Sequence, residues 1–261
     1  MIALESGLTL SNHNFSTVLS HKQPSRVILA IPHDGLISND YSGMFCARKF
    51  GIKGRDAHVW PVANDIVHRS VELQTQIDAV RFLMARAYVD ANRELPLDVN
   101  LDPDTLGQTA LDDPLLAPVY HEYHGQLSRL VERSITRFGA DQVLFIDLHG
   151  FGRQPRIAPP EGYDLILGTA NRVTIHHGEV DRTFATYMRE RGYSVFLPNV
   201  QPMTLEGDPF SAGHTTRWYA KHYRINAIQI EIFSSFRRRE SEIRGRKLAL
   251  DIADFLSHHY R

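Results

Sequence analysis

Three short apolar runs, at 27–31, 143–150 and 227–233, dominate the hydrophobic pattern of the chain. Continuous runs of this length, rich in β-branched residues, are typical of strands buried on both faces, as in a largely parallel sheet. Shorter candidates for strands lie at 57–62, 165–168 and 194–198.

Between these runs, apolar residues recur at helical spacing. The spacing predicts helices over 74–86, 118–138, 181–192 and about 240–258. Strands that alternate with helices predict an α/β fold with three layers, α/β/α, around a mixed and largely parallel central sheet.

The composition agrees with one globular domain over residues 1–261, because 43% of the 261 residues are hydrophobic and 23% are charged. A single α/β domain of about 250 residues is common. Stretches near 95–118 and 200–216 predict long loops, and loops of that length usually serve a function.

Charge and apolar content exclude some classes of function. The formal net charge is −1, which is poorly suited to binding nucleic acid. No apolar run approaches the roughly 18 residues of a membrane span, and no basic segment precedes an apolar core as in a signal peptide. We therefore expect a cytoplasmic protein that binds neither nucleic acid nor membrane. We interpret the three arginines at 237–239 as a solvated face or a helix start.

Each of the three strong strand candidates ends near a titratable group. His33 follows the first, Asp147 and His149 end the second, and Glu231 lies late in the third. Ligands bind outside the carboxyl ends of the strands in open α/β sheets, so these groups can converge there. Two imidazoles and one carboxylate form a catalytic zinc set that leaves a fourth position for water.

The carboxylate of that set has a candidate in Asp65, which follows the strand candidate at 57–62. Asp65 is equally suited to cap the segment that follows it. A carboxylate that does not bind the metal can act as the general base toward water, and Glu231 suits that role.

Two further clusters are candidates for binding a substrate. Arg86, Asn92 and Arg93 can clamp a carboxylate, or they can simply end a helix with favourable cations. Tyr120 and His124 are four residues apart and share a helix face. They either contact the substrate or pack a partly exposed face.

The order of these motifs resembles the N-formylglutamate amidohydrolase family, metal-dependent hydrolases related in fold to zinc carboxypeptidases and to aspartoacylase-like enzymes. The resemblance runs from about Val27 to Phe233. It rests on Pro32–Gly35, Asp65, Arg86–Arg93, Tyr120–His124, Asp147–Gly150, Leu167–Thr169 and Ala227–Ile232.

The resemblance implies a role for each candidate residue. His33, Asp65 and His149 correspond to the ligands of a divalent metal, most simply zinc. Glu231 corresponds to the general base, and Arg86 to the group that polarises the scissile carbonyl or helps to bind the carboxylate. The implied substrate-binding residues are Asn92, Arg93, Tyr120 and His124.

The chain also departs from the family pattern. Asp34 and Gly150 stand where the family usually has a serine after the first and the last histidine. A later family loop, Asn-x-Pro-Tyr-x-Gly-Gly, is replaced by residues 207–214. Asp34 is therefore an alternative to Asp65 as the metal carboxylate, and the scaffold and hydrolytic class carry over better than the exact substrate.

These observations predict a metal-dependent amidohydrolase that cleaves a small N-acyl amino acid similar to N-formylglutamate, whose free carboxylate is held by arginine. Two alternatives remain at this stage. One is a metallopeptidase for short or cell-wall-type peptides, and the other is a catalytically inactive binding module on the same scaffold.

Overall fold

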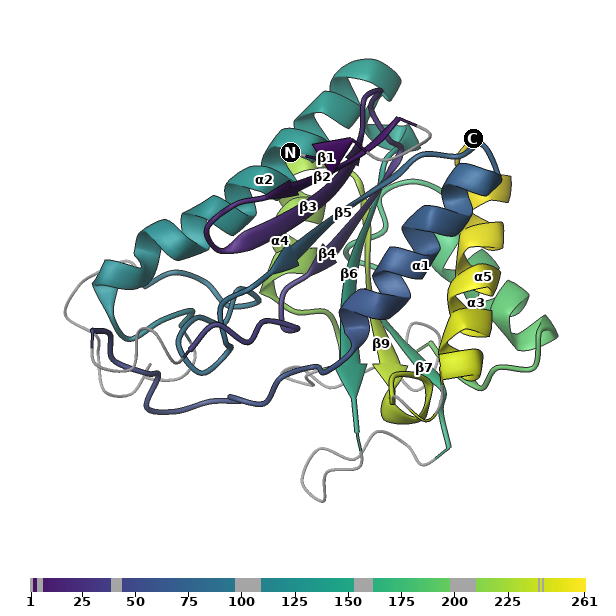
Figure 1. The fold of residues 1–261 in the computed structure, drawn as a ribbon. Coiled ribbons are helices and arrows are strands. Elements are labelled where there is room, and N and C mark those ends of the chain that lie inside the picture. The colour runs from purple at the N-terminus through teal and green to yellow at the C-terminus, as the bar shows by residue number, and fades with distance from the viewer. Residues whose placement is uncertain are drawn as a thin grey trace.

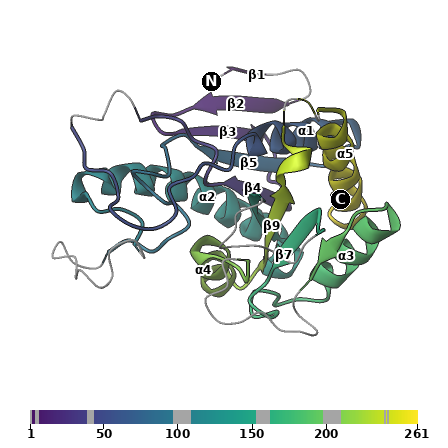
Figure 2. The same cartoon turned by 90° about the horizontal axis from the view of Figure 1, so that it is seen from below.

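The computed structural model describes residues 2–3, 7–38, 44–96, 109–152, 162–197, 210–238, 240 and 242–261. Within these ranges the strands form one nine-stranded sheet in the order β1-β2-β3-β5-β4-β6-β9-β7-β8 (Figures 1 and 2). The strands are β1 (Ile2–Ala3), β2 (Leu8–Asn12), β3 (Ser16–His21), β4 (Val27–Ile31), β5 (Ile77–Phe82), β6 (Leu144–Phe151), β7 (Leu165–Gly168), β8 (Val195–Phe196) and β9 (Asn226–Phe233). The helices are α1 (Val59–Glu72), α2 (Ala117–Phe138), α3 (Val180–Glu190), α4 (His214–Tyr223) and α5 (Glu242–His259).

The middle of the sheet is parallel. Strands β5, β4, β6 and β9 run in one direction, whereas β3 pairs antiparallel to β5 and β7 pairs antiparallel to β9. The carboxyl ends of the parallel strands therefore meet at one edge, which is where ligands bind in such sheets. The predicted α/β fold with a mixed central sheet is confirmed.

Helices cover both faces of the sheet (Figure 2). Helices α1, α3 and α5 pack on one face around a core that includes Leu29, Ile146 and Leu248. Helices α2 and α4 pack on the other face around Ile28, Tyr123 and Phe145. Because both faces are covered, the central strands are apolar on both sides, which explains their continuous hydrophobic runs.

Two of the predicted elements have the wrong type. The predicted helix over 74–86 contains β5, and the predicted strand over 57–62 runs into the start of α1. In β5 the side chains of Ile77 and Ala79 enter one core and those of Val80 and Phe82 the other. This two-sided burial removes the alternation that would have marked a strand, and the remaining spacing resembles that of a helix.

The predicted long loops lie largely outside the described residues, since 97–108 and 198–209 are not among them. The described ends of both loops contain regular structure. A short 3₁₀ helix at Pro114–Leu116 precedes α2, and α4 begins at His214. In the described part of the chain, no helix combines the length and the apolar character needed to cross a membrane.

Candidate active site

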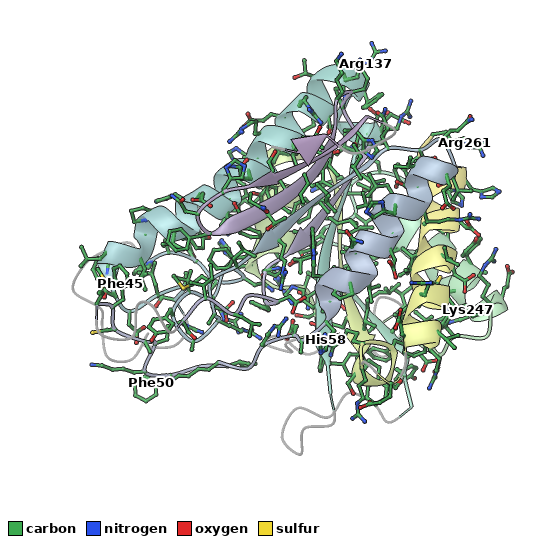
Figure 3. All side chains as sticks on the ribbon, viewed as in Figure 1. Phe45, Phe50, His58, Arg137, Lys247 and Arg261 are labelled. Carbon is green, nitrogen blue, oxygen red and sulfur yellow. The ribbon has the colours of Figure 1, made fainter. Side chains whose placement is uncertain are left out.

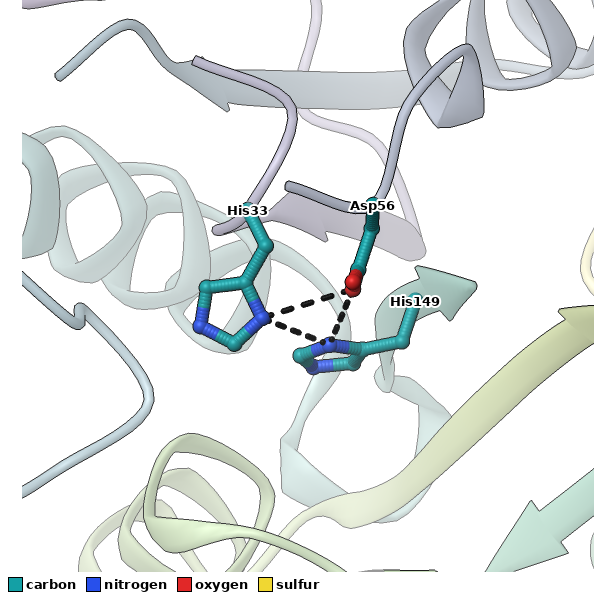
Figure 4. Close-up of side chains that lie close together, drawn as sticks. All are labelled: His33, Asp56 and His149. Carbon is teal, nitrogen blue, oxygen red and sulfur yellow. Dashed lines mark hydrogen bonds and ion pairs between the residues drawn. The ribbon is translucent and has the colours of Figure 1, made fainter. Parts of the chain in front are cut away.

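Three side chains meet at the carboxyl edge of the sheet: His33, which follows β4, His149 on β6, and Asp56 on the loop before α1 (Figure 4). The two Nδ1 atoms of the histidines lie 3.1 Å apart. Oδ2 of Asp56 lies 3.4 Å from Nδ1 of His33 and 3.2 Å from Nδ1 of His149. Ligands of a tetrahedral zinc ion, with bonds near 2.0–2.1 Å, are about 3.3 Å apart, so the three atoms have the spacing of a metal set.

The outer nitrogen of each imidazole faces a buried aspartate. Nε2 of His33 lies 2.7 Å from Asp90 Oδ1, and Nε2 of His149 lies 3.0 Å from Asp147 Oδ1. We assign the ring proton of His33 to Nε2, because Asp90 Oδ1 accepts it there. The Nδ1 atoms of both rings face one another and Asp56. Two imidazole nitrogens and a carboxylate oxygen that converge in this way fit a cation, and carboxylates behind histidine ligands are usual at metal sites.

The electrostatics of the cluster also favour positive charge. Burial by itself lowers the pKa of His149, but Asp147 and Asp56 outweigh it and hold that pKa well above its ordinary value. Burial raises the pKa of Asp56, but the two imidazoles and Arg86 outweigh that effect and keep the carboxyl ionised. The donor set thus fits a divalent metal ion in both geometry and charge.

Asp56 takes the place predicted for Asp65. Asp65 lies within α1, facing Glu242 and Arg246 of α5, and therefore neither joins the two histidines nor caps a helix. The strand predicted over 57–62 is instead the start of α1, so Asp65 falls within the helix and Asp56 lies on the loop that enters it.

The alternative carboxylate, Asp34, is also directed elsewhere. Its side chain accepts hydrogen bonds from the backbone amides of His58 and Trp60, at 3.2 and 2.7 Å, and so caps the first turn of α1. Arg55 pairs with the same carboxylate. Asp34 therefore fixes the segment that carries Asp56, without reaching the histidines.

Glu231 lies next to this cluster on the neighbouring strand. It is in register with His149 across β6 and β9, and Gln229 Nε2 donates a 2.9 Å hydrogen bond to its Oε1. Burial raises the pKa of Glu231 to about 7, and nearby Asp56 and Asp147 add to the rise. A carboxyl group with a pKa near neutrality is suited to take up and release a proton.

A cavity of about 320 Å³ opens over the cluster. Arg86 and Arg93 line it together with Asp56, His149 and Glu231. Nε of Arg86 donates a 3.0 Å hydrogen bond to Asp90, which fixes its guanidinium beside the metal set. The structure therefore brings two of the predicted arginines into the same cavity as the titratable groups.

The other predicted substrate-binding residues lie behind Arg93. Tyr120 donates its hydroxyl hydrogen to the Arg93 carbonyl, and His124 Nε2 lies 3.0 Å from the Ala91 carbonyl. Burial lowers the pKa of His124 to about 4, so it is neutral at pH 7. Asn92 Oδ1 accepts a hydrogen bond from the Thr215 backbone amide, and Asn92 Nδ2 lies 3.2 Å from His149 Nε2. Tyr120 and His124 therefore support the backbone of 91–93, whereas the Asn92 side chain joins it to α4 and contacts His149. None of the three side chains is among those that line the cavity.

The sequence analysis predicts no site residue in the segment between Met44 and His58. It runs along one side of the molecule, past the half-buried Phe45 and the exposed Phe50, and reaches the strand ends at His58 (Figure 3). Asp56 sits near the end of this segment, where its amide donates to the His33 carbonyl at 3.0 Å. No local hydrophobic pattern marks Asp56, because only the path of this segment brings it to the site.

A sequence profile named N-formylglutamate amidohydrolase matches residues 25–236, which is most of the chain. The chain belongs to the N-formylglutamate amidohydrolase family. Membership makes it a hydrolase that acts on a carbon–nitrogen bond other than a peptide bond. The predicted family is confirmed, and the alternative of a catalytically inactive binding module is set aside.

Solved structures support the same fold. An N-formylglutamate amidohydrolase from Ralstonia eutropha JMP134 is 19% identical, with a TM-score of 0.65 over 94% of this chain and 99% of that chain. A gene product from Agrobacterium tumefaciens is 14% identical, with a TM-score of 0.63 over 95% and 94% of the two chains. No curated protein matches the chain significantly. Similarity at this level of identity shows a shared fold.

Proposed function

We propose that the protein is a metal-dependent amidohydrolase that removes the acyl group from a small N-acyl amino acid of the N-formylglutamate type. The observation that carries the proposal is that one cavity is lined by Asp56 and His149 of the His-Asp-His donor set, by the buried Glu231, and by Arg86 and Arg93. Each group supplies a part of amide hydrolysis, and the family supplies the reaction class.

His33, Asp56 and His149 would hold the metal, most simply zinc. A divalent ion so held supplies Lewis-acid polarisation and acidifies water. Glu231, in register with His149 on the neighbouring strand, takes the proton from the attacking water and returns it to the leaving nitrogen. Arg86, fixed by Asp90, donates to the oxygen on which negative charge develops.

Arg93 is the group proposed to bind the free carboxylate of the substrate. It lines the same cavity, and the backbone behind it is fixed by Tyr120. The planar guanidinium can donate two parallel hydrogen bonds to a carboxylate. A volume of about 320 Å³ is at the small end of ligand sites, which favours a single N-acyl amino acid over a peptide.

The test is a hydrolysis assay on purified protein, with bound metal measured by elemental analysis. N-formylglutamate, N-acetylglutamate, N-formylleucine and a glycyl-glutamate dipeptide separate the acyl group, the side chain and the peptide alternative. We expect about one zinc ion per chain and hydrolysis of the N-acyl glutamates. Cleavage of the dipeptide alone would instead support the peptidase, and active protein without bound metal would refute the metal-dependent route.

A further inference from the structure

Arg237 differs from the solvated arginine that the sequence predicts. Arg237 is only 8% exposed, although it begins a run of basic residues. Its guanidinium binds three backbone carbonyls: Nε donates to Ile232 at 3.0 Å, Nη2 donates to Phe151 at 3.1 Å, and Nη1 donates to Ala57. A surface arginine has no need of such partners, so the contacts identify an internal role.

The three carbonyls come from three of the segments that carry the site. Ala57 directly follows Asp56, and Ile232 directly follows Glu231. Phe151 lies two residues after His149 at the end of β6. These segments are far apart in the sequence, and a single rigid, planar group joins them at the carboxyl edge of the sheet.

Gly150 provides the space for this guanidinium. A Cβ atom placed on Gly150 would overlap the Cζ, Nε and Nη2 atoms of Arg237. Gly150 is not among the glycines with positive φ, so its backbone does not itself require glycine. The residue that departs from the usual serine of the family is thus the one over which Arg237 lies.

We propose that Arg237 is a positioning residue that holds the Asp56, His149 and Glu231 segments in register with one another, and that Gly150 exists to admit it. The proposal rests on the proposed function for the roles of those three residues. Arg237 also lines the cavity, but each of its three guanidinium nitrogens donates to a backbone carbonyl, so we assign it a role through the residues it places.

Arg133 offers a matched control at the opposite end of the sheet. It too binds backbone carbonyls, those of His21 and Gln23, together with the carboxylate of Asp78. Arg237→Met and Arg133→Met both remove an arginine that joins separate segments. Only the first of them is expected to disturb the site, so the pair separates positioning from a general loss of stability.

The first measurement is hydrogen exchange of the metal-free proteins, read in peptides that cover 54–58. In Arg237→Met we expect exchange there to be at least tenfold faster than in wild type, because the Ala57 carbonyl loses its donor. Arg133→Met is expected to leave these peptides unchanged. Wild-type exchange rates at 54–58 in Arg237→Met would overturn the proposal.

The second measurement is the zinc dissociation constant, obtained by competition with a chelator. We expect it to rise at least tenfold in Arg237→Met and to change less than twofold in Arg133→Met. Equal zinc affinity in wild type and Arg237→Met would also refute the positioning role. A wild type that binds no zinc would count against the proposed function alone, because the exchange experiment on metal-free protein still decides the role of Arg237.

A second variant covers the case in which Arg237→Met fails to fold. Gly150→Ala keeps the arginine but displaces its guanidinium, and we expect the same rise in exchange at 54–58. The loss of stability caused by Gly150→Ala should shrink in an Arg237→Ala background, where no guanidinium occupies the space. An undiminished loss would show that Gly150 and Arg237 are not coupled and would overturn the pairing.

Discussion

Two aspartates at opposite ends of the sheet, the buried Asp78 and the partly buried Asp56, have contrasting surroundings. At the start of β5, Asp78 accepts the amide of His21 at 2.8 Å and the guanidinium of Arg133 at 2.9 Å. At the carboxyl edge, Asp56 shares its oxygen with two imidazoles beside a cavity. Burial raises the pKa of Asp78 to about 6, whereas the two imidazoles and Arg86 outweigh the effect of burial at Asp56 and hold its pKa below the ordinary value.

The contrast shows that a buried charge alone does not mark a functional site. The partners of Asp78 are donors that satisfy it, which is what folding requires of a buried carboxylate. The Asp56 oxygen and the two imidazole nitrogens next to it converge on one point beside a cavity, which suits a ligand. The arrangement of donors and acceptors, rather than burial, therefore separates the structural end of the sheet from the chemical end.

The sharpest test of this contrast removes histidines from each end. His33→Ala combined with His149→Ala takes away two of the three converging donors. We expect loss of bound metal and of all measurable hydrolysis, because the remaining carboxylate cannot hold the ion. Elemental analysis and the hydrolysis assay measure both. His21→Gln at the other end is the control, and loss of metal there would break the distinction.

The next effect concerns the proton carrier. Glu231→Gln keeps the size of the side chain but cannot accept a proton. We expect kcat to fall about 10³-fold, in the range typical of general acid–base groups, while one metal ion per chain is retained. A kcat near that of wild type would remove Glu231 from its proposed role.

A smaller effect is expected at the substrate end. Arg93→Ala removes a charged pair with the substrate carboxylate, which corresponds to about 2 kcal/mol, so KM should rise about thirtyfold while kcat changes little. Arg26→Ala is a control, because Arg26 instead contacts Gln142 and Phe138. Steady-state kinetics with N-formylglutamate would contradict the assignment if KM were the same in Arg93→Ala and wild type.

The smallest effect on activity is expected from Arg133→Met, which changes stability instead. We expect the free energy of unfolding to fall by about 2 kcal/mol at pH 7.5, because the buried Asp78 loses its cation. The loss stays this small because Arg133 is itself one-third exposed, which weakens the ion pair. Since the pKa of Asp78 is raised above 3.8 in the folded state, folding takes up a proton, and this group stabilises the fold as the pH falls from about 7 toward 4. The loss should therefore shrink at pH 5.

Denaturant unfolding at the two pH values measures that change, with zinc affinity as a second readout. A loss of stability in Arg133→Met that grows toward pH 5 would contradict the raised pKa of Asp78. If Arg133→Met had wild-type stability but a reduced zinc affinity, Arg133 would be coupled to the site. That result would weaken the contrast between the two ends of the sheet.

The hydrophobic pattern along the chain was enough to predict the central strands and part of the site. The apolar runs at β4, β6 and β9 identified buried parallel strands, and parallel strands must end at a common edge. From that rule alone His33, His149 and Glu231 could be expected together. The family resemblance, carried by the order of the motifs, matched the profile found over residues 25–236.

Only the tertiary structure decided the rest. β5 lacks the alternation of a strand because it is buried on both faces, and the first residues of α1 alone do not distinguish a helix from a strand. Asp56 and Arg237 reach the site on loops and strand ends whose paths depend on long-range contacts, here the Asp34 cap of α1 and the three carbonyls around Arg237. Sequence periodicity reports which face of an element is buried, whereas the meeting of distant loops depends on how the whole sheet is packed.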